Sequence, residues 1–87
     1  MVKPGFYKHY KGKIYRVLAT GRHSESLELM IVYQGLYESV EFGSQPIFVR
    51  PYDLFVENIA HNGINQPRFQ YLSEEISHPE QAKLFEQ

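Results

Sequence analysis

The strongest constraint on the fold is a hairpin pattern at residues 5–17, in which aromatic side chains alternate with cations on both sides of Gly12. The residues before the glycine fit the two faces of a strand, with Phe6, Lys8 and Tyr10 on one face and Tyr7, His9 and Lys11 on the other. Gly12 can adopt a positive φ, which predicts a tight turn. The strand expected after the turn, Ile14–Gly21, carries apolar side chains on both faces: Tyr15, Val17 and Ala19 on one, Ile14 and Leu18 on the other. This pattern predicts a closed or strongly curved sheet.

The size of the chain and its lack of cysteine determine how such a sheet must be stabilised. Eighty-seven residues suit one domain, and without cysteine there is no disulfide framework or thiolate metal site. Seven Tyr and six Phe are then the main material for a core. The sequence shows no signal peptide and no apolar run long enough to span a bilayer, so we expect a soluble cytoplasmic protein without a membrane partner.

Further short strands follow along the chain. We expect them at Leu29–Tyr33, Ile47–Val49, Glu57–His61 and Pro67–Leu72, with the first two buried. The connections are a polar turn at Arg22–Ser26, a loop at Glu38–Pro46, a helical turn at Arg50–Phe55 that returns Phe55 to the core, and a tight turn at Asn62-Gly63. The prediction is a mainly β domain over residues 1–72 with five or six short strands.

The tail from residue 73 to 87 has a different character. Ser77 and Glu80 have the spacing of a capping box, and Pro79 suits the first turn of a helix. We therefore expect a short helix at His78–Glu86. This helix could pack on the same chain or on another one, which leaves the oligomeric state open.

Charge is distributed unevenly along the chain. Residues 1–22 hold six cations and no acid, whereas the remaining residues hold three cations and ten acids. The cations Lys8, Lys11, Lys13 and Arg16 alternate with tyrosines, as in proteins that bind single-stranded nucleic acid. The competing interpretation, which the acidic remainder favours, is that these cations pair with the chain's own Glu25, Glu28, Glu38 or Glu57.

Several enzymatic and cofactor chemistries find little support. His23, Ser24 and Glu25 are consecutive, and neighbours on an extended chain point to opposite faces, so a turn is favoured over a hydrolytic triad. The four histidines lack metal-ligand spacing, and the glycines form no phosphate-binding loop. We expect no metal and no cofactor.

Two arginines combine charge with apolar surroundings. Arg50 follows the strand expected at 47–49, where a partly buried guanidinium would need a carboxylate such as Glu25, Glu28 or Glu57. A structural salt bridge is favoured over a ligand contact. Arg68, which precedes Phe69, allows the same two interpretations.

The chain resembles a family of small prokaryotic domains of unknown function. The resemblance covers about residues 5–70, and it rests on Gly5, Tyr7, His9-Tyr10-Lys11-Gly12-Lys13, Tyr15 and Val17, then His23-Ser24-Glu25, Glu28, Val32-Tyr33, Leu36-Tyr37, Val49-Arg50-Pro51, Phe55, Glu57 and Pro67-Arg68-Phe69. It implies an SH3-like barrel and no assigned activity. Phe48 stands where the family typically has Trp, and the loop at 38–46 is longer than usual, so a binding role carried over from the family is weakest there.

These observations favour a non-enzymatic SH3-like binding or adaptor module for an unknown protein or a small polar ligand. The candidate binding residues are Tyr7, His9, Lys11, His23, Glu25, Tyr37 and Arg50. The function remains open to two alternatives. One is a nucleic-acid-binding domain that uses the basic hairpin, and the other is a small enzyme with a pocket around His9, Glu25 and Arg50.

Overall fold

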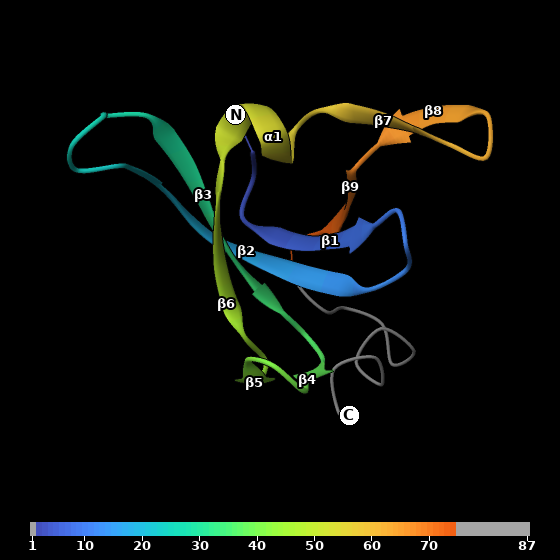
Figure 1. Ribbon diagram of the computed structural model, residues 1–87, viewed down its shortest axis with the longest axis horizontal. Helices are drawn as coiled ribbons and strands as arrows, with labels where there is room; N and C mark the ends of the chain where they lie inside the picture. Colours follow the sequence, from blue (N-terminus) through green and yellow to red (C-terminus); the bar gives the residue numbers. More distant parts are fainter. Residues whose placement is uncertain (1, 75–87) are drawn as a thin grey trace.

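The structure, a computed structural model, describes residues 2–74, which form a mainly β fold (Figure 1). Its elements are β1 (Gly5–His9), β2 (Ile14–Arg22), β3 (Leu29–Gly35), β4 (Glu38–Ser39), β5 (Gly43–Ser44), β6 (Ile47–Pro51), α1 (Tyr52–Phe55), β7 (Asn58–His61), β8 (Ile64–Pro67) and β9 (Phe69–Ser73). Five strands form one antiparallel sheet in the order β6-β3-β2-β1-β9. The remaining strands form two small hairpins, β4-β5 and β7-β8.

The hairpin expected at residues 5–17 is confirmed. Gly5 pairs with Val17, and Lys8 pairs with Ile14. Gly12 has a φ of 112° at the turn, and its N–H donates to the carbonyl of His9 at 2.7 Å. A glycine is needed here because a side chain would be strained at this φ.

A β-bulge in β2 changes which residues face the core. Val17 pairs with Tyr33 and Ala19 with Val32, which leaves Leu18 as the extra residue. Val17 is buried while Ala19 is exposed, so the expectation that they share a face is wrong. The bulge adds local twist, and Figure 1 shows β1 crossing steeply over the direction of β6.

The core is largely aromatic, as the composition predicts. Its buried members are Tyr7, Val17, Ile31, Tyr33, Phe55 and Phe69. The helical turn α1 is confirmed, and it brings Phe55 back onto Phe69, with the two rings stacked at 4.2 Å and 4° apart. Burial of several rings in so small a chain contributes most of the favourable free energy of folding.

Three expectations about the sheet are corrected. β6 is an outer strand, and its Ile47 and Val49 are 61% and 59% exposed, so they are not buried as expected. The loop at 38–46 contains the β4-β5 ladder, and the strand expected at 57–61 pairs as β7 with β8, a strand at 64–67 that the sequence did not predict. Both residues of the turn at Asn62-Gly63 have positive φ, which fits its sequence.

The sheet is not shown to close into a barrel. Within residues 2–74, the outer strands β6 and β9 have no ladder between them. The helix expected at 78–86 lies outside the described residues. In the described part, no helix has the length and apolar character needed to cross a membrane.

Candidate functional site

Tyr7, one of the predicted binding residues, belongs to the core. Its side chain is buried, and its hydroxyl donates to the carbonyl of Lys3 at 2.7 Å. Burial raises the pKa of this hydroxyl. The ring packs edge-on against Phe55 and Tyr71, which explains a structural role.

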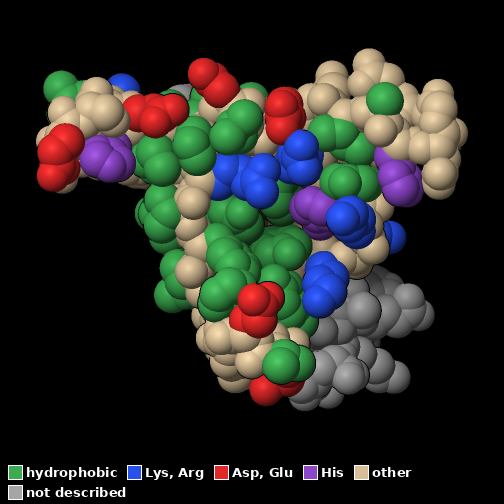
Figure 2. All heavy atoms as spheres, viewed as in Figure 1, with side chains coloured by type: hydrophobic (Ala, Val, Ile, Leu, Met, Phe, Trp, Pro, Cys, Tyr) green, Lys and Arg blue, Asp and Glu red, His purple; other side chains and the backbone are tan. Residues whose placement is uncertain are grey.

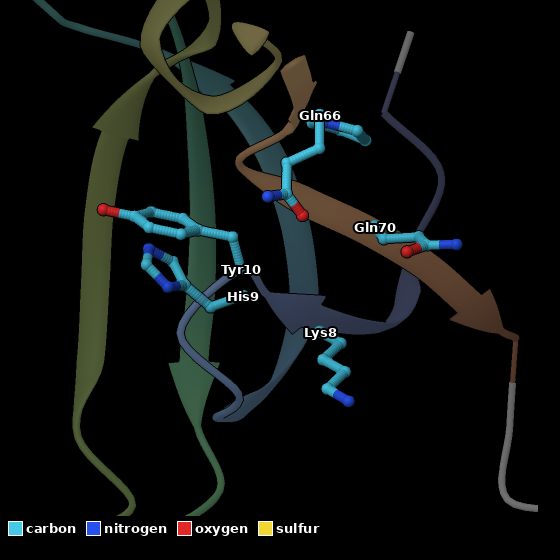
Figure 3. Close-up of a pocket in the computed structure, with 6 residues that line it drawn as sticks. Lys8, His9, Tyr10, Gln66 and Gln70 are labelled. Carbon is cyan, nitrogen blue, oxygen red and sulfur yellow. The ribbon is translucent and has the colours of Figure 1, made fainter. Parts of the chain in front are cut away.

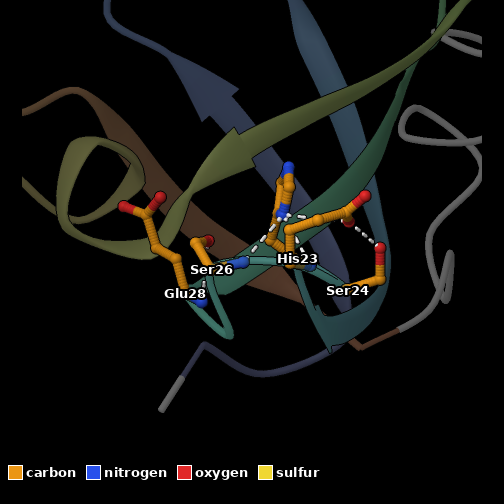
Figure 4. Close-up of polar contacts among 5 residues, drawn as sticks. His23, Ser24, Ser26 and Glu28 are labelled. Atoms are coloured by element: carbon orange, nitrogen blue, oxygen red, sulfur yellow. Dashed lines mark hydrogen bonds and ion pairs between the residues drawn. The ribbon is translucent and has the colours of Figure 1, made fainter.

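His23 and Glu25 build the turn between β2 and β3 (Figure 4). The Nδ1 of His23 accepts the backbone N–H groups of Glu25 and Ser26 at 3.2 and 3.3 Å. The hydroxyl of Ser24 donates to the Glu25 carboxylate and not to the imidazole. The three residues are therefore connected as a turn and not as nucleophile, base and orienting acid.

This turn is remote from the other predicted binding residues. The β2-β3 loop and the β1-β2 turn lie on opposite sides of the molecule in Figure 1. The charges that act on His9 come from Arg68, Arg50 and Lys11, and Glu25 is not among them. The structure therefore does not assemble an enzyme pocket from His9, Glu25 and Arg50.

His9 lies at the end of β1 among aromatic rings. Its ring is 4.5 Å from that of Tyr10 and 4.9 Å from that of Phe69, measured between ring centres. Its Nδ1 accepts the backbone N–H of Lys11 at 3.1 Å. Burial lowers the pKa of His9, and Arg68, Arg50 and Lys11 lower it further. His9 is thus a neutral imidazole at neutral pH, with its proton on Nε2.

Arg50 is partly buried, as expected, but its partners differ from the expectation. Its Nε donates to the hydroxyl of Tyr33 at 3.2 Å, and its guanidinium carbon is 5.7 Å from the centre of the Phe69 ring. Within residues 2–74 no carboxylate lies within ion-pair distance of it. The predicted salt bridge is therefore absent from the described part of the chain.

Arg68 has the salt bridge that was considered for it. Its Nη2 is 2.7 Å from Oε1 of Glu57, and its Nε donates to the same oxygen at 3.2 Å. This contact joins the residue before β9 to the residue before β7. Arg68 also faces the Tyr10 ring at 5.9 Å.

Tyr37 completes an aromatic group around Tyr15. The two hydroxyls form a hydrogen bond at 3.2 Å, and the ammonium of Lys13 lies 4.1 Å from the centre of the Tyr37 ring. Burial, followed by the bond to Tyr37, raises the pKa of Tyr15. Phe48 packs 5.7 Å from Tyr33, so it belongs to the same aromatic group.

The hairpin cations contact rings and not carboxylates. Lys11 lies 5.8 Å from the Tyr10 ring, Lys13 lies over Tyr37, and Arg16 lies 5.7 Å from Phe6. None of the hairpin cations has an ion pair within residues 2–74, so the expected pairing with the chain's own acids is wrong for this part of the chain. Cation–π contacts leave the positive charge available to an external anion.

We call the surface formed by these groups the basic aromatic face. It consists of His9, Tyr10, Lys11, Lys13, Tyr15, Tyr37, Arg50 and Arg68, and it rests on the buried ring of Phe69. Figure 2 shows Lys and Arg side chains across the middle of the molecule beside a His, next to a hydrophobic area, with Asp and Glu mostly toward the margins. His9, Lys11, Tyr37 and Arg50 of the predicted set belong to this face. Tyr7, His23 and Glu25 do not.

A small hollow borders the face (Figure 3). Its volume is 160 Å³, and it is lined by Lys8, His9, Tyr10, Gln66, Pro67 and Gln70. Figure 3 shows the rings of His9 and Tyr10 together on one side and Gln70 apart from them. Sites for drug-sized ligands usually measure about 300–1,000 Å³, so this hollow suits a small group or one part of a larger ligand. In the described residues, no three His, Asp or Glu side chains converge as metal ligands.

Sequence reasoning placed Tyr15, Arg68 and Phe69 outside the predicted binding set. Tyr15 was expected to share a face with Val17 and was considered for binding only among the hairpin tyrosines of the nucleic-acid alternative; the signal that could have placed it was its position opposite Tyr7 in the first hairpin. Phe69 and Arg68 reach the face because β9 pairs with β1, a contact between the two ends of the domain. A local pattern cannot show such a contact.

Comparisons with known proteins give a family and a fold. The family model described as "Protein of unknown function (DUF1653)" matches residues 5–71. A crystal structure of a Bordetella bronchiseptica protein that belongs to DUF1653 is similar, with a TM-score of 0.77 and 31% sequence identity over 88% of this chain and 95% of that one. No curated protein matches the chain.

Proposed function

Since the chain belongs to the DUF1653 family, whose function is unknown, we propose from the geometry of its basic aromatic face that it is a non-enzymatic binding module for an acidic segment of a protein. The twisted five-stranded antiparallel sheet supports an SH3-like arrangement for this module. Small β folds bind ligands on exposed faces of this kind, although fold alone does not determine function.

One observation carries the proposal. The cations of the face have rings as partners, and Arg50 has a hydroxyl, where carboxylates were expected. A partly buried guanidinium without a counterion is costly, and an acidic ligand would supply the missing charge. Of the cations of the face, Arg68 alone pairs with a carboxylate of the described residues 2–74, that of Glu57.

A protein ligand is favoured over nucleic acid because the aromatic rings of the face already contact other side chains. Binders of single-stranded nucleic acid stack bases on open aromatic faces. Here Tyr10 is packed by His9 at 4.5 Å and by His61 at 5.1 Å, and Tyr37 is covered by Lys13. Part of the surface of both rings is therefore already in contact with other side chains, whereas the charges remain available.

The test is a titration of the ¹⁵N-labelled full chain with a short peptide rich in Asp and Glu, followed by NMR. We expect saturable shifts at the β1-β2 turn, at the C-terminal end of β6 near Arg50 and at the N-terminal end of β9 near Arg68. Lys13→Gln should weaken binding several-fold, about 1 kcal/mol for one exposed charge. Arg22→Gln removes the same charge at the other end of the sheet and is the matched control.

Two outcomes would overturn the proposal. One is that the acidic peptide gives no saturable shift and so behaves like the matched Asn and Gln peptide. The other is tighter binding of a single-stranded oligonucleotide with a steep dependence on salt, which would assign the face to nucleic acid.

A further inference from the structure

Arg50 is held in a fixed orientation with part of its donor set unused. β6 places it opposite Ile31 of β3, and its Nε is bound to the hydroxyl of Tyr33 at 3.2 Å. The guanidinium also lies against the Phe69 ring. Within residues 2–74 the two terminal amino groups have no acceptor. Such a fork, fixed in advance, suits bidentate binding of a carboxylate or phosphate.

His9 supplies a second hydrogen-bond donor that is held in orientation and has no acceptor within residues 2–74. Because Nδ1 accepts the N–H of Lys11, the neutral ring carries its proton on Nε2. That N–H has no acceptor within residues 2–74. Its lowered pKa keeps the ring neutral, so it donates without requiring protonation.

Both side chains contact the Phe69 ring. The His9 ring is 4.9 Å from the centre of Phe69, and the Arg50 guanidinium carbon is 5.7 Å from it. Phe69 is itself fixed because it stacks on Phe55, which is 2% exposed. Both donors therefore rest on a rigid part of the core.

The local field at this point is positive. The charges that act on His9 belong to Arg68, Arg50 and Lys11, from three different parts of the sheet and its turns. The carboxylate of Glu57 is engaged by Arg68. An anion that reached His9 and Arg50 would therefore meet cations in a partly desolvated setting, where charge-assisted hydrogen bonds are strong.

We propose that Arg50 and His9 form an oxyanion site that binds a single carboxylate or phosphate group, which anchors the ligand on the basic aromatic face. The terminal amino groups of Arg50 donate to two oxygens of the group, and Nε2–H of His9 donates to one of them. This inference rests on the proposed binding function and specifies the part of the ligand that the face recognises.

The experiment titrates the labelled full chain separately with inorganic phosphate and with acetate, and uses chloride at the same ionic strength as the reference. The expected result is a saturable shift of the Arg50 Nε–H and His9 ring signals with at least one of the two anions. Binding of phosphate alone indicates a phosphate-bearing ligand, and binding of acetate indicates a carboxylate-bearing one. No saturable shift with either anion overturns the proposal.

Variants distinguish binding at Arg50 and His9 from a general effect of positive charge. Arg50→Gln should weaken binding of the effective anion about tenfold, and Arg22→Gln should leave it unchanged. His9→Phe keeps a ring on Phe69 and removes the donor, so it should weaken binding several-fold while the core signals of Val17 and Ile31 stay in place. Equal binding by Arg50→Gln or His9→Phe and by the unaltered chain overturns the proposal.

The failures of the two proposals can be told apart. If Arg50→Gln binds the acidic peptide as well as the unaltered chain does, the oxyanion site is wrong and the binding face stands. If phosphate or acetate binds at Arg50 and His9 while the acidic peptide does not bind, the oxyanion site stands and the protein ligand is wrong.

Discussion

At the scale of single residues, the surroundings of His9 decide its charge. Burial is the largest effect that lowers its pKa from 6.5, and the cations Arg68, Arg50 and Lys11 add to it. The sequence predicted His9, Lys11 and Arg50 as binding residues from the first hairpin and from the position of Arg50 beside Pro51. It could not show that His9 and Arg50 both contact the Phe69 ring, because those contacts depend on β9 returning to β1.

Removal of the Arg50 charge should raise the pKa of His9 toward 6.5, since one of the cations that lower it is lost. The measurement is an NMR titration of the His9 ring in Arg50→Gln, with Arg22→Gln as the control. An unchanged His9 pKa in Arg50→Gln would show that the two side chains do not interact.

The same lowered pKa links folding stability to pH. Because the folded-state pKa of His9 lies below 6.5, the unfolded chain takes up this proton first as the pH falls. The contribution of neutral His9 to stability is therefore full above pH 6.5 and declines as the pH falls below it. Urea unfolding above and below pH 6.5 should show a smaller decline in His9→Phe than in the unaltered chain, and an equal decline would contradict this account.

Gly35 is a position where a single methyl group should disturb the face. A Cβ there would lie 2.4 Å from Cε2 of Tyr37, whose hydroxyl is bonded to Tyr15. Gly35→Ala should displace the Tyr37 ring and lower the free energy of unfolding by about 1–3 kcal/mol. Gly21→Ala is the control, because a Cβ at Gly21 would meet nothing within 4 Å. Equal stability of the two variants in urea unfolding would refute the tight contact.

At the scale of elements, the short helix α1 contributes through one residue. Phe55 is 2% exposed and stacks on Phe69, whereas Leu54 beside it is 47% exposed. The sequence predicted this turn because Pro51 cannot extend a ladder and suits the start of a helix. The contribution of α1 to stability therefore comes mainly from burial of Phe55.

Phe55→Ala should lower the free energy of unfolding by about 3–5 kcal/mol, because it leaves a cavity beneath Phe69. Leu54→Ala should cost less than about 1 kcal/mol, since the side chain is half in solvent. Thermal or urea unfolding of both variants measures the difference. A similar loss in both would mean that Phe55 does not anchor the helix.

Some elements could not be predicted from local pattern. The bulge at Leu18 shifts the alternation of β2, so that Ala19 no longer lies on the same face as Val17. The alternating pattern of the sequence gives no sign of this extra residue. Ile47 and Val49 form an apolar run typical of a buried strand, yet β6 lies at the edge of the sheet. Strand order is set by tertiary pairing, so an edge position cannot be deduced from the run itself.

At the scale of the whole molecule, the uneven charge of the sequence survives folding. The sequence favoured cancellation of the hairpin cations by the chain's own acids, but His23 and Glu25 lie at the opposite end of the sheet from the β1-β2 turn. The long β2-β3 hairpin keeps Glu25 away from the cations of the first hairpin, whereas Glu57 pairs with Arg68 on the face itself. A molecule with a net charge of −1 therefore still presents a cationic face.

The central claim is that this face binds an anionic ligand, and the most direct test is the acidic-peptide titration repeated at low and high salt. The account predicts saturable NMR shifts confined to the basic aromatic face, with affinity that falls as salt rises because exposed charges are screened. Reversal of charge in Lys11→Glu/Lys13→Glu should abolish the shifts without loss of the fold. Binding that persists in this variant, or that maps to the β2-β3 turn, would contradict the account.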